Sequence, residues 1–378
     1  MQTQFVSVQQ HRRYNNAARQ FILKLNSERL KMIKLLYISL AEHMKFREGA
    51  AVEMIRNAGS IEALFNSMAS VQLEDNMSLA GGILETCLQK DINIITIEDP
   101  RYPEVLKRLS DPPLVLYYRG VWRDLSKGLS IAMVGQRKAT ATGKMNAERF
   151  ARDLTLNGVN IISGLAAGID GASHRGAIKA GGFTVGVLGT GVDVYYPVEN
   201  AGLMRTMAKE HLVISEFAPG TGGKPQNFPK RNRIVAALAK GTFVVEAQVK
   251  SGSLITARLA REMGRDVFAL VDHSEGCQSL IAKGQAVAVR NAEDIISYYM
   301  PKGDKEQIKT PPKSEKPLTE EEIEILRLIA LGKQKEEISE IMGLDISKVT
   351  RRVNMLEIKG YIVKTGHSKY EISERAIK

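Results

Sequence analysis

The spacing of apolar residues divides the chain into segments of different kinds. Residues 28–90 place apolar side chains at helical intervals, as in "ERLKMIKLLYISLAEHM" and "GSIEALFNSM". This pattern predicts a small helical domain, which we assign to residues 1–90. In residues 92–120, two apolar runs flank a proline-containing connection and predict two strands. Strands are therefore expected only after the first 90 residues.

Seven short apolar runs follow between residues 129 and 300, separated by helical segments. The runs are "LSIAMVG", "NIISG", "TVGVLG", "HLVISEF", "GTFVVEA", "DVFALV" and "AVAV". Nearly continuous apolar runs are typical of parallel strands that helices cover on both faces. We therefore predict an α/β fold with a doubly wound, mostly parallel sheet in a domain over residues 91–300. Such sheets bind ligands at the carboxyl ends of their strands.

The C-terminal residues have a different character. Residues 301–317, "PKGDKEQIKTPPKSEKP", are rich in lysine and proline and predict a linker. Residues 318–378 predict three helices and a short hairpin, which is the outline of a winged-helix domain. An unrelated three-helix module is the alternative.

Charge adds a class of partner to this picture. The 378 residues carry a formal net charge of +11, and the excess of basic residues is largest in residues 129–300. A basic surface favours polyanionic partners: nucleic acid, anionic lipid or an acidic protein. A basic enzyme without such a partner is the alternative. No apolar stretch is long enough for a signal peptide or a membrane span, so we expect a cytoplasmic protein without membrane contact.

Motifs for bound cofactors are missing from the sequence. The turn after the run "LSIAMVG" lacks GxGxxG, and no GxxxxGK[ST] loop occurs, so neither a dinucleotide nor ATP or GTP is expected. Cys87 and Cys277 lie far apart without a CxxC pair, which argues against a disulfide framework and a cysteine-based zinc site. We therefore expect no cofactor and no metal.

Glycine-rich turns follow five of the predicted strands. They read "VGQRKATATG", "SGLAAGIDGASH", "GTGVDVYYP", "SEFAPGTGGKPQNFPKRNR" and "EAQVKSGSLITA". In a parallel sheet these turns converge at one edge, where glycines let a ligand approach the backbone and free N–H groups at helix starts attract phosphate. The sequence therefore predicts one binding region built from five turns.

Residues suited to catalysis are few. Asp170 and His174 lie four positions apart on one predicted helix face, and a structural hydrogen bond between them is favoured over acid–base chemistry. Glu216 and Glu246 each end a strand, where they either face the site or serve as internal counter-charges for nearby cations. No nucleophile stands out, and we expect no enzymatic activity and no catalytic residue.

The stretch "NFPKRNRIVAAL" gives the clearest sign of an anion site. With Pro229 as the first helical residue, Lys230 and Arg231 fall in the first turn and Arg233 just beyond it. Because a helix N-terminus is already partly positive, each cation there costs about 0.3–1 kcal/mol unless an anion lies opposite. The apolar residues that follow bury one stripe and leave the cations at the mouth of the site. Phe228 is placed to stack on a base.

Other residues of the turns extend this site. Arg137 and Lys138 add positive charge at the first turn, and Ser251, Gly252 and Ser253 add small donors at the fifth. The combination predicts a track for a polyanion. Single-stranded nucleic acid fits such a cleft better than a duplex, whose readers usually insert a helix or a ribbon.

A purely structural role for the cations remains open. In that interpretation Arg231 or Arg233 pairs with Glu216 or Glu246, and Phe228 lies in the core. The sequence alone leaves both interpretations standing.

These motifs together resemble the DprA/Smf family, the DNA-processing proteins of bacterial natural transformation. "GLAAGID", "GVDVYYP", "FPKRNRIVAAL" and "EAQVKSGSLITA" occur in the family order, and the resemblance covers nearly the whole chain from about residue 30. It implies a Rossmann-like domain that binds and protects single-stranded DNA and loads the RecA recombinase onto it past single-strand-binding protein. It also implies a homodimer and a helical N-terminal domain of the SAM or helix-hairpin-helix kind.

The resemblance assigns DNA contacts to individual residues of this chain. They are Arg137, Gly168, Phe228, Lys230, Arg231, Asn232 and Arg233, with Ser251, Gly252 and Ser253 at the border of the same pocket. Several positions depart from the family, and two of them lie in the predicted binding turns. Gln136 stands where serine or alanine is usual, and Ala167 stands where arginine or lysine is common, so one cation is lost. The N-terminal helices lack the glycine-bracketed hairpin of DNA-binding relatives, and we expect them to support the structure rather than grip DNA.

Three functions follow from these observations. We favour a mediator of recombination that binds single-stranded DNA without being an enzyme. The alternatives are an enzyme of similar architecture that hydrolyses the N-glycosidic bond of nucleoside monophosphates, and a duplex-binding regulator that acts through Lys348, Arg351 and Arg352 of the winged helix. Reversal of the three cations in "FPKRNR" to glutamate is expected to abolish DNA binding while the fold stays intact.

Overall fold

The computed structural model describes residues 28–44, 47–67, 71–271, 274–300, 318–358, 361–366 and 369–372. The chain forms two compact units, Met1–Ile308 and Lys309–Lys378. The predicted linker, residues 301–317, lies outside the described residues. The linker and the domain boundaries assigned from the sequence therefore stay predictions.

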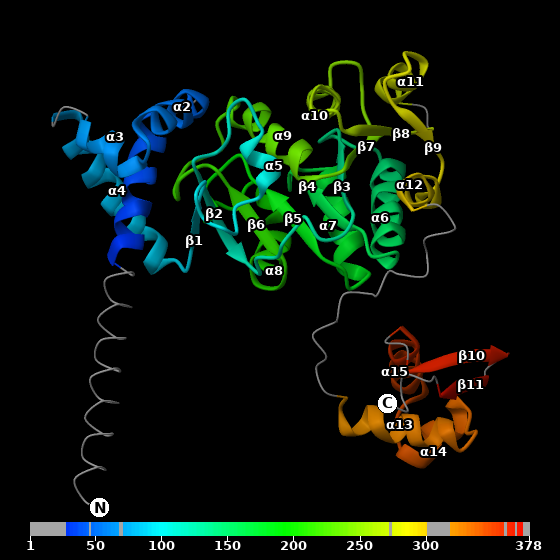
Figure 1. The fold of residues 1–378 in the computed structure, drawn as a ribbon. Helices are drawn as coiled ribbons and strands as arrows, with labels where there is room; N and C mark the ends of the chain where they lie inside the picture. The colour runs from blue at the N-terminus through cyan, green and yellow to red at the C-terminus, as the bar shows by residue number, and fades with distance from the viewer. Residues whose placement is uncertain are drawn as a thin grey trace, which may run out of the picture. The chain divides into compact units, whose positions relative to one another are not determined.

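Among the described residues, one nine-stranded sheet organises the larger unit (Figure 1). Its strands are β1 (Asn93–Thr96), β2 (Val115–Gly120), β3 (Ser130–Gly135), β4 (Asn160–Ser163), β5 (Thr184–Val187), β6 (Leu212–Ser215), β7 (Gly241–Glu246), β8 (Asp266–Leu270) and β9 (Val287–Val289). They lie in the order β1-β2-β6-β5-β4-β3-β7-β8-β9. The strands from β3 to β9 pair in parallel, and β1 and β2 join antiparallel beside β6. The predicted α/β fold with a mostly parallel, Rossmann-like sheet is confirmed.

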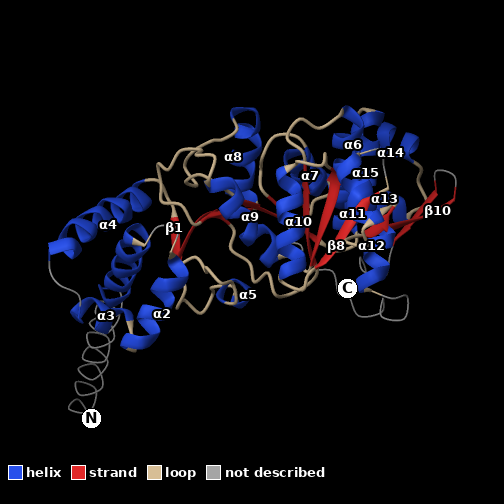
Figure 2. Cartoon of the chain, turned by 90° about the horizontal axis from the view of Figure 1, so that it is seen from above, coloured by secondary structure: helices blue, strands red, loops and turns tan. Residues whose placement is uncertain are grey.

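Helices lie on both sides of these strands (Figure 2). They are α5 (Glu104–Lys107), α6 (Ala141–Leu156), α7 (Ile169–Lys179), the 3-10 turn η1 (Val198–Asn200), α8 (Ala201–Glu210), α9 (Asn227–Leu238), α10 (Gly252–Glu262), α11 (Glu275–Ala282) and α12 (Ala292–Tyr299). In β3, Ile131 and Met133 pack into a cluster with α6 and α7, and Ala132 and Val134 pack into another with α9 and α10. Because successive strand side chains point to opposite faces, a strand covered on both sides must be apolar throughout.

The strand order reverses beside β3. From β3 the chain adds β4, β5 and β6 in turn on one side, and it then crosses to place β7 on the other side of β3. The turns after β3 and β7 therefore lead in opposite directions and leave a crevice between them at the carboxyl edge.

The N-terminal helices lie at the β1 edge of the sheet (Figure 1). They comprise helical residues 28–43, α2 (Glu48–Ala58), α3 (Ile61–Ser67) and α4 (Val71–Gln89). Their side chains share one hydrophobic cluster with β1, β2 and α8, as Tyr37, Ile94 and Met204 show. The helical prediction for residues 28–90 is confirmed over the described part of that range. This hydrophobic cluster contains residues from both sides of the domain boundary that was predicted at residue 90.

The smaller unit contains three helices and two strands among its described residues. They are α13 (Glu320–Ala330), α14 (Lys335–Met342), α15 (Ile346–Ile358), β10 (Ile362–Gly366) and β11 (Lys369–Ile372). β10 and β11 pair antiparallel. Lys348 and Arg352, two of the three cations expected to touch a duplex, form ion pairs with Glu321 of α13. The assignment as a winged helix stays a prediction.

Candidate functional site

Two adjoining cavities lie at the carboxyl ends of the parallel strands. The larger has a volume of about 370 Å³ and the smaller about 70 Å³. Both are lined by Arg137, Gly164, Ala166, Tyr196 and Phe228. The lining residues come from the turns after β3, β4, β5, β6 and β7, so the five glycine-rich turns meet at one edge as expected. The larger cavity occupies the crevice where the strand order reverses.

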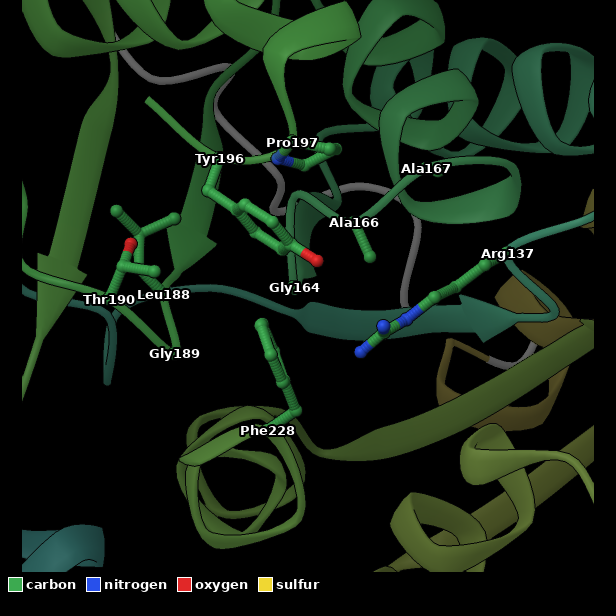
Figure 3. Close-up of a pocket in the computed structure, with 10 residues that line it drawn as sticks. All are labelled: Arg137, Gly164, Ala166, Ala167, Leu188, Gly189, Thr190, Tyr196, Pro197 and Phe228. Atoms are coloured by element: carbon green, nitrogen blue, oxygen red, sulfur yellow. The ribbon is translucent and has the colours of Figure 1, made fainter. Parts of the chain in front are cut away.

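Three side chains point toward one another across the smaller cavity (Figure 3). The ring centroids of Tyr196 and Phe228 are 5.5 Å apart, and the guanidinium carbon of Arg137 lies 4.6 Å from the centroid of the Phe228 ring. Phe228 is half-buried and Tyr196 is 41% exposed, so neither ring belongs to the core. Two aromatic rings and a guanidinium plane form a surface on which a flat ring can stack.

The wall formed by Tyr196 was missed by the sequence analysis. Tyr196 lies in the turn "GVDVYYP", whose glycines were noticed, but a tyrosine in a turn has no spacing that reveals where its ring points. Gly189 in the same connection is also required. A Cβ atom there would lie 2.8 Å from Cδ1 of Phe228, so only glycine lets the ring pack against this turn.

Arg231 is buried between the turns after β4 and β5. Its Nη1 donates to the carbonyl oxygens of Gly164, at 2.6 Å, and of Val187. Burial lowers the pKa of the guanidinium to about 10, still far above neutrality. Asp170 lies nearby and accepts hydrogen bonds from two backbone N–H groups, at 3.1 and 3.4 Å. Burial raises the pKa of Asp170, and the charge of Arg231 opposes that rise.

Lys230 and Arg233 do not line these two cavities. Arg233 forms a two-pronged ion pair with Glu216 at 2.7 and 2.8 Å, and Lys230 Nζ lies 2.5 Å from Glu48 Oε1. Both cationic side chains are about nine-tenths buried. The prediction that these cations face the mouth of the site is wrong, and the alternative pairing with Glu216 is correct for Arg233.

Helix geometry explains this division of the cations. At 3.6 residues per turn, Phe228, Arg231 and Asn232 fall on one side of α9, and all three line the larger cavity. Lys230 and Arg233 fall on the opposite side, against carboxylates. Reversing all three cations to glutamate would place new negative charges beside buried carboxylates, so we now expect the triple variant to lose stability. The helix also begins at Asn227, two residues before Pro229.

Glu246, the last residue of β7, holds the turn after β3 by hydrogen bonds. This carboxylate accepts hydrogen bonds from Nε2 of Gln136 and from the backbone N–H and hydroxyl of Thr140. Glu246 therefore orders the turn rather than neutralising a cation. Arg137 and Lys138 project from it, are both exposed, and form no ion pair with another described residue. The departure at Gln136 thus adds a bond inside the protein.

The turn after β7 leads directly into the N-terminus of α10. Ser251 is the N-cap of α10, and its hydroxyl accepts from the backbone N–H of Ser253 and hydrogen-bonds to the Ser253 hydroxyl at 2.7 Å. Ser251, Gly252 and Ser253 all line the larger cavity. The partial positive charge of this helix start is therefore directed at the cavity.

His174 has a different partner from the expected one. Its Nδ1 hydrogen-bonds to the Thr184 hydroxyl at 2.7 Å, whereas Asp170 accepts from the backbone, so the predicted bond between the two side chains is wrong. Burial lowers the pKa of His174 to about 3, and the ring is neutral at physiological pH. His174 therefore joins α7 to Thr184 of β5 in the interior.

A sequence model of the family described as DNA recombination-mediator protein A matches residues 93–300, which hold both cavities. The chain belongs to the DprA/Smf family. It is 44% identical over 219 residues to DNA processing protein DprA of Bacillus subtilis, covering 57% of this chain and 73% of the relative. It is 32% identical over 371 residues to Protein Smf of Synechocystis, covering 88% of this chain and 93% of the relative.

Solved structures of DprA proteins share the fold. The X-ray structure of DprA from Streptococcus pneumoniae is 35% identical with a TM-score of 0.60, covering 70% of this chain and 95% of that one. DprA from Helicobacter pylori is 31% identical with a TM-score of 0.50, covering 55% of this chain and 95% of that one. The study of the second describes its binding mode for single-stranded DNA.

Gly168 is not among the residues that line the two cavities, but its backbone packs closely against the turn after β3. Its φ is +77°, and a Cβ atom would lie 2.4 Å from the carbonyl oxygens of Gln136 and Arg137. We expect Gly168→Ala to lower the free energy of unfolding by about 1–3 kcal/mol, because the turn after β3 must shift and alanine is strained at this φ. Urea unfolding measures this. Gly202→Ala in α8, where a Cβ atom meets no other atom within 4 Å, is the control, and equal stability of the two variants would contradict the prediction.

Within the described residues, no helix is long and apolar enough to cross a membrane, and no three His, Cys, Asp or Glu side chains are grouped so as to hold a metal ion. Cys87 and Cys277 are buried and free.

Proposed function

We propose that this DprA/Smf family member binds and protects single-stranded DNA in the two cavities and loads the RecA recombinase onto it. The observation that carries the proposal is the convergence of Tyr196, Phe228 and Arg137 on one small recess. The family match to a recombination mediator and the single-stranded DNA binding described for the Helicobacter pylori relative support it.

The geometry favours an unpaired base. In a duplex both faces of a base are stacked and its edge is paired, so a base can enter a recess between side chains only from a single strand. In our proposal the base stacks on Phe228, and Arg137 and Lys138 neutralise phosphates at the rim. The start of α10 at Ser251, Gly252 and Ser253 attracts a further phosphate. Arg231 and Asn232 form the cavity wall beneath.

The proposal extends to partners that the mediator role requires. A mediator must work on DNA already covered by single-strand-binding protein and must pass that DNA to RecA. We therefore include both proteins as partners, with the chain acting as a cytoplasmic homodimer in DNA recombination during natural transformation. These partners follow from membership of the family.

The chemistry of the cavities disfavours the nucleotide hydrolase. Among the described residues that line them, Asp170 is the only carboxylate, and it is occupied by two backbone N–H groups. Hydrolysis of a glycosidic bond usually uses a pair of carboxyl groups, one as acid and one as base or nucleophile. Glu216 and Glu246 are not available for this task, because each is bonded inside the protein.

Fluorescence anisotropy with labelled oligothymidylate and a hairpin duplex tests the proposal. We expect tight binding to the single strand, with log K falling against log salt by about 0.7 per phosphate neutralised, and weak binding to the hairpin. RecA filament formation on DNA coated with single-strand-binding protein should then accelerate when the protein is added. Preference for the hairpin would favour the duplex-binding regulator. Release of free base from nucleoside monophosphates would favour the hydrolase.

A further inference from the structure

A cluster of five charged side chains lies on the side of α9 that faces away from the cavities. We call it the α9 cluster, and it consists of Glu48, Asp111, Glu216, Lys230 and Arg233. Lys230 Nζ lies 2.5 Å from Glu48 Oε1, 3.6 Å from Glu216 Oε2 and 3.9 Å from Asp111 Oδ2. Arg233 pairs with Glu216 at 2.7 Å and with Asp111 at 3.6 Å. The cluster therefore joins three separate segments of the chain to the first turns of α9.

Glu48 is the member that comes from the N-terminal helices. It is the first residue of α2, outside residues 93–300 that match the family model. The next residue is held as well, because the backbone N–H of Gly49 donates to Asp111 Oδ1 at 2.8 Å. A Cβ atom on Gly49 would lie 2.3 Å from the Ser110 carbonyl oxygen, so α2 approaches this loop as closely as a backbone can. The start of α2 is thus docked against the loop beside α9.

The charge balance of the α9 cluster argues against a role for Glu48 in stability. The cluster holds three carboxylates and two cations, so Glu216 and Asp111 alone would balance Lys230 and Arg233. Oε2 of Glu48 is buried and has no hydrogen-bond partner among the described residues. A buried carboxylate with an unpaired oxygen costs free energy that a neutral residue would not. We therefore attribute the benefit of Glu48 to the position that it gives to Lys230.

We propose that Glu48 is a positioning residue for the DNA-binding cavities: it draws Lys230 toward α2 and so sets the first turn of α9, where Phe228 faces Tyr196. This inference rests on the proposed function. Lys230 follows Phe228 by two positions in the same turn, so a shift of one moves the other. A cavity of about 80 Å³, lined by Glu48, Glu216 and Lys230 among others, leaves room for Lys230 to move when Glu48 is replaced.

A second ion pair ties the same helices to the opposite wall of the recess. Lys90, which follows α4, lies 2.6 Å from Asp193 Oδ2, and Asp193 Oδ1 accepts from the Gly220 backbone N–H at 2.8 Å. Asp193 precedes Tyr196 by three residues in the same turn. Both aromatic walls are therefore adjacent to anchors on the N-terminal helices, although none of the described residues of those helices lines the two cavities at the carboxyl edge.

The test compares Glu48→Ala with Glu53→Ala, which removes an exposed glutamate from the same helix. We expect Glu48→Ala to weaken binding of oligothymidylate about tenfold, because part of the stacking on Phe228 is lost. The slope of log K against log salt stays unchanged, since no phosphate contact is removed. The melting temperature stays that of Glu53→Ala. An oligonucleotide with one 2-aminopurine should lose stacking-dependent quenching in the Glu48→Ala complex.

A double variant, Glu48→Gln with Lys230→Met, removes the pair together and keeps the net charge of the α9 cluster. We expect it to bind as Glu48→Ala does, with the same salt slope. A slope smaller by about 0.7 would identify Lys230 as a phosphate contact and overturn the inference. Wild-type affinity and quenching in Glu48→Ala would overturn it too, while leaving the proposed function in place. Failure of the wild-type protein and Glu53→Ala to bind would instead reject the proposed function, and the inference with it.

Discussion

Replacement of Arg231 by methionine is expected to lower the free energy of unfolding by about 3–5 kcal/mol, the range for a buried charge that loses its partner. The variant leaves the carbonyl oxygens of Gly164 and Val187 without their donor. It also removes the charge that opposes the rise of the Asp170 pKa, so this carboxyl group is expected to take up a proton more readily. Since Gly164, Asp170 and Arg231 line the larger cavity, DNA binding should be lost together with the stability.

Urea unfolding followed by circular dichroism measures this effect. The matched control is Arg258→Met, which breaks an exposed ion pair with Glu262 at 2.8 Å and is expected to cost less than about 1 kcal/mol. A double variant, Arg231→Met with Asp170→Asn, should recover part of the lost stability because the unpaired carboxylate is gone. A cost for Arg231→Met no larger than that of the control would show that the guanidinium is not needed at this junction.

Replacement of Phe228 by alanine is expected to weaken binding of single-stranded DNA by about 5- to 150-fold, the equivalent of about 1–3 kcal/mol for one stacked base. Arg137→Gln should weaken binding too, and it should reduce the salt slope by about 0.7 because one phosphate contact is lost. The two effects are coupled, since the Arg137 guanidinium lies over the Phe228 ring. Their sum should therefore differ from the effect of the double variant.

Anisotropy titrations of oligothymidylate at several salt concentrations separate the two contributions. Phe228→Leu keeps an apolar side chain of similar size but removes the ring, and it should bind nearly as weakly as Phe228→Ala. Arg149→Gln, which removes an exposed cation from α6, is the control for a general loss of positive charge. Wild-type affinity in Phe228→Leu would mean that Phe228 acts by packing alone, and base stacking would have to be sought at Tyr196.

The strands and helices of the larger unit were predictable because the pattern of apolar residues within a short stretch of sequence indicates which side chains are buried. β3 alternates between two clusters on opposite faces, so every residue of the run "SIAMV" is apolar or small. The same logic identified the edge where the five turns meet, since parallel strands place all their carboxyl ends on one side. Arg137, Phe228 and Ser251 could accordingly be assigned to one region from their places after predicted strands.

The partners of individual side chains were not predictable in this way. Nothing local to "FPKRNR" shows that Arg231 turns toward Gly164 and Val187 while Arg233 turns toward Glu216. A start of α9 two residues earlier or later rotates every side chain by about 200°, which exchanges the two faces of the helix. The predicted hydrogen bond between His174 and Asp170 was wrong for a related reason. Spacing along a helix cannot reveal that the hydroxyl of Thr184, on the neighbouring strand β5, is the partner of His174.

By itself, the sequence determined the order of the elements, the parallel sheet and the edge that carries the site, because these follow from apolar periodicity and from turns that act over a few residues. Only the tertiary structure decided which cations face the cavities, that Tyr196 stands opposite Phe228, and that Glu48 reaches Lys230 across 182 positions of sequence. Such contacts depend on how distant segments pack against one another, and a buried charge takes whichever partner that packing brings within reach.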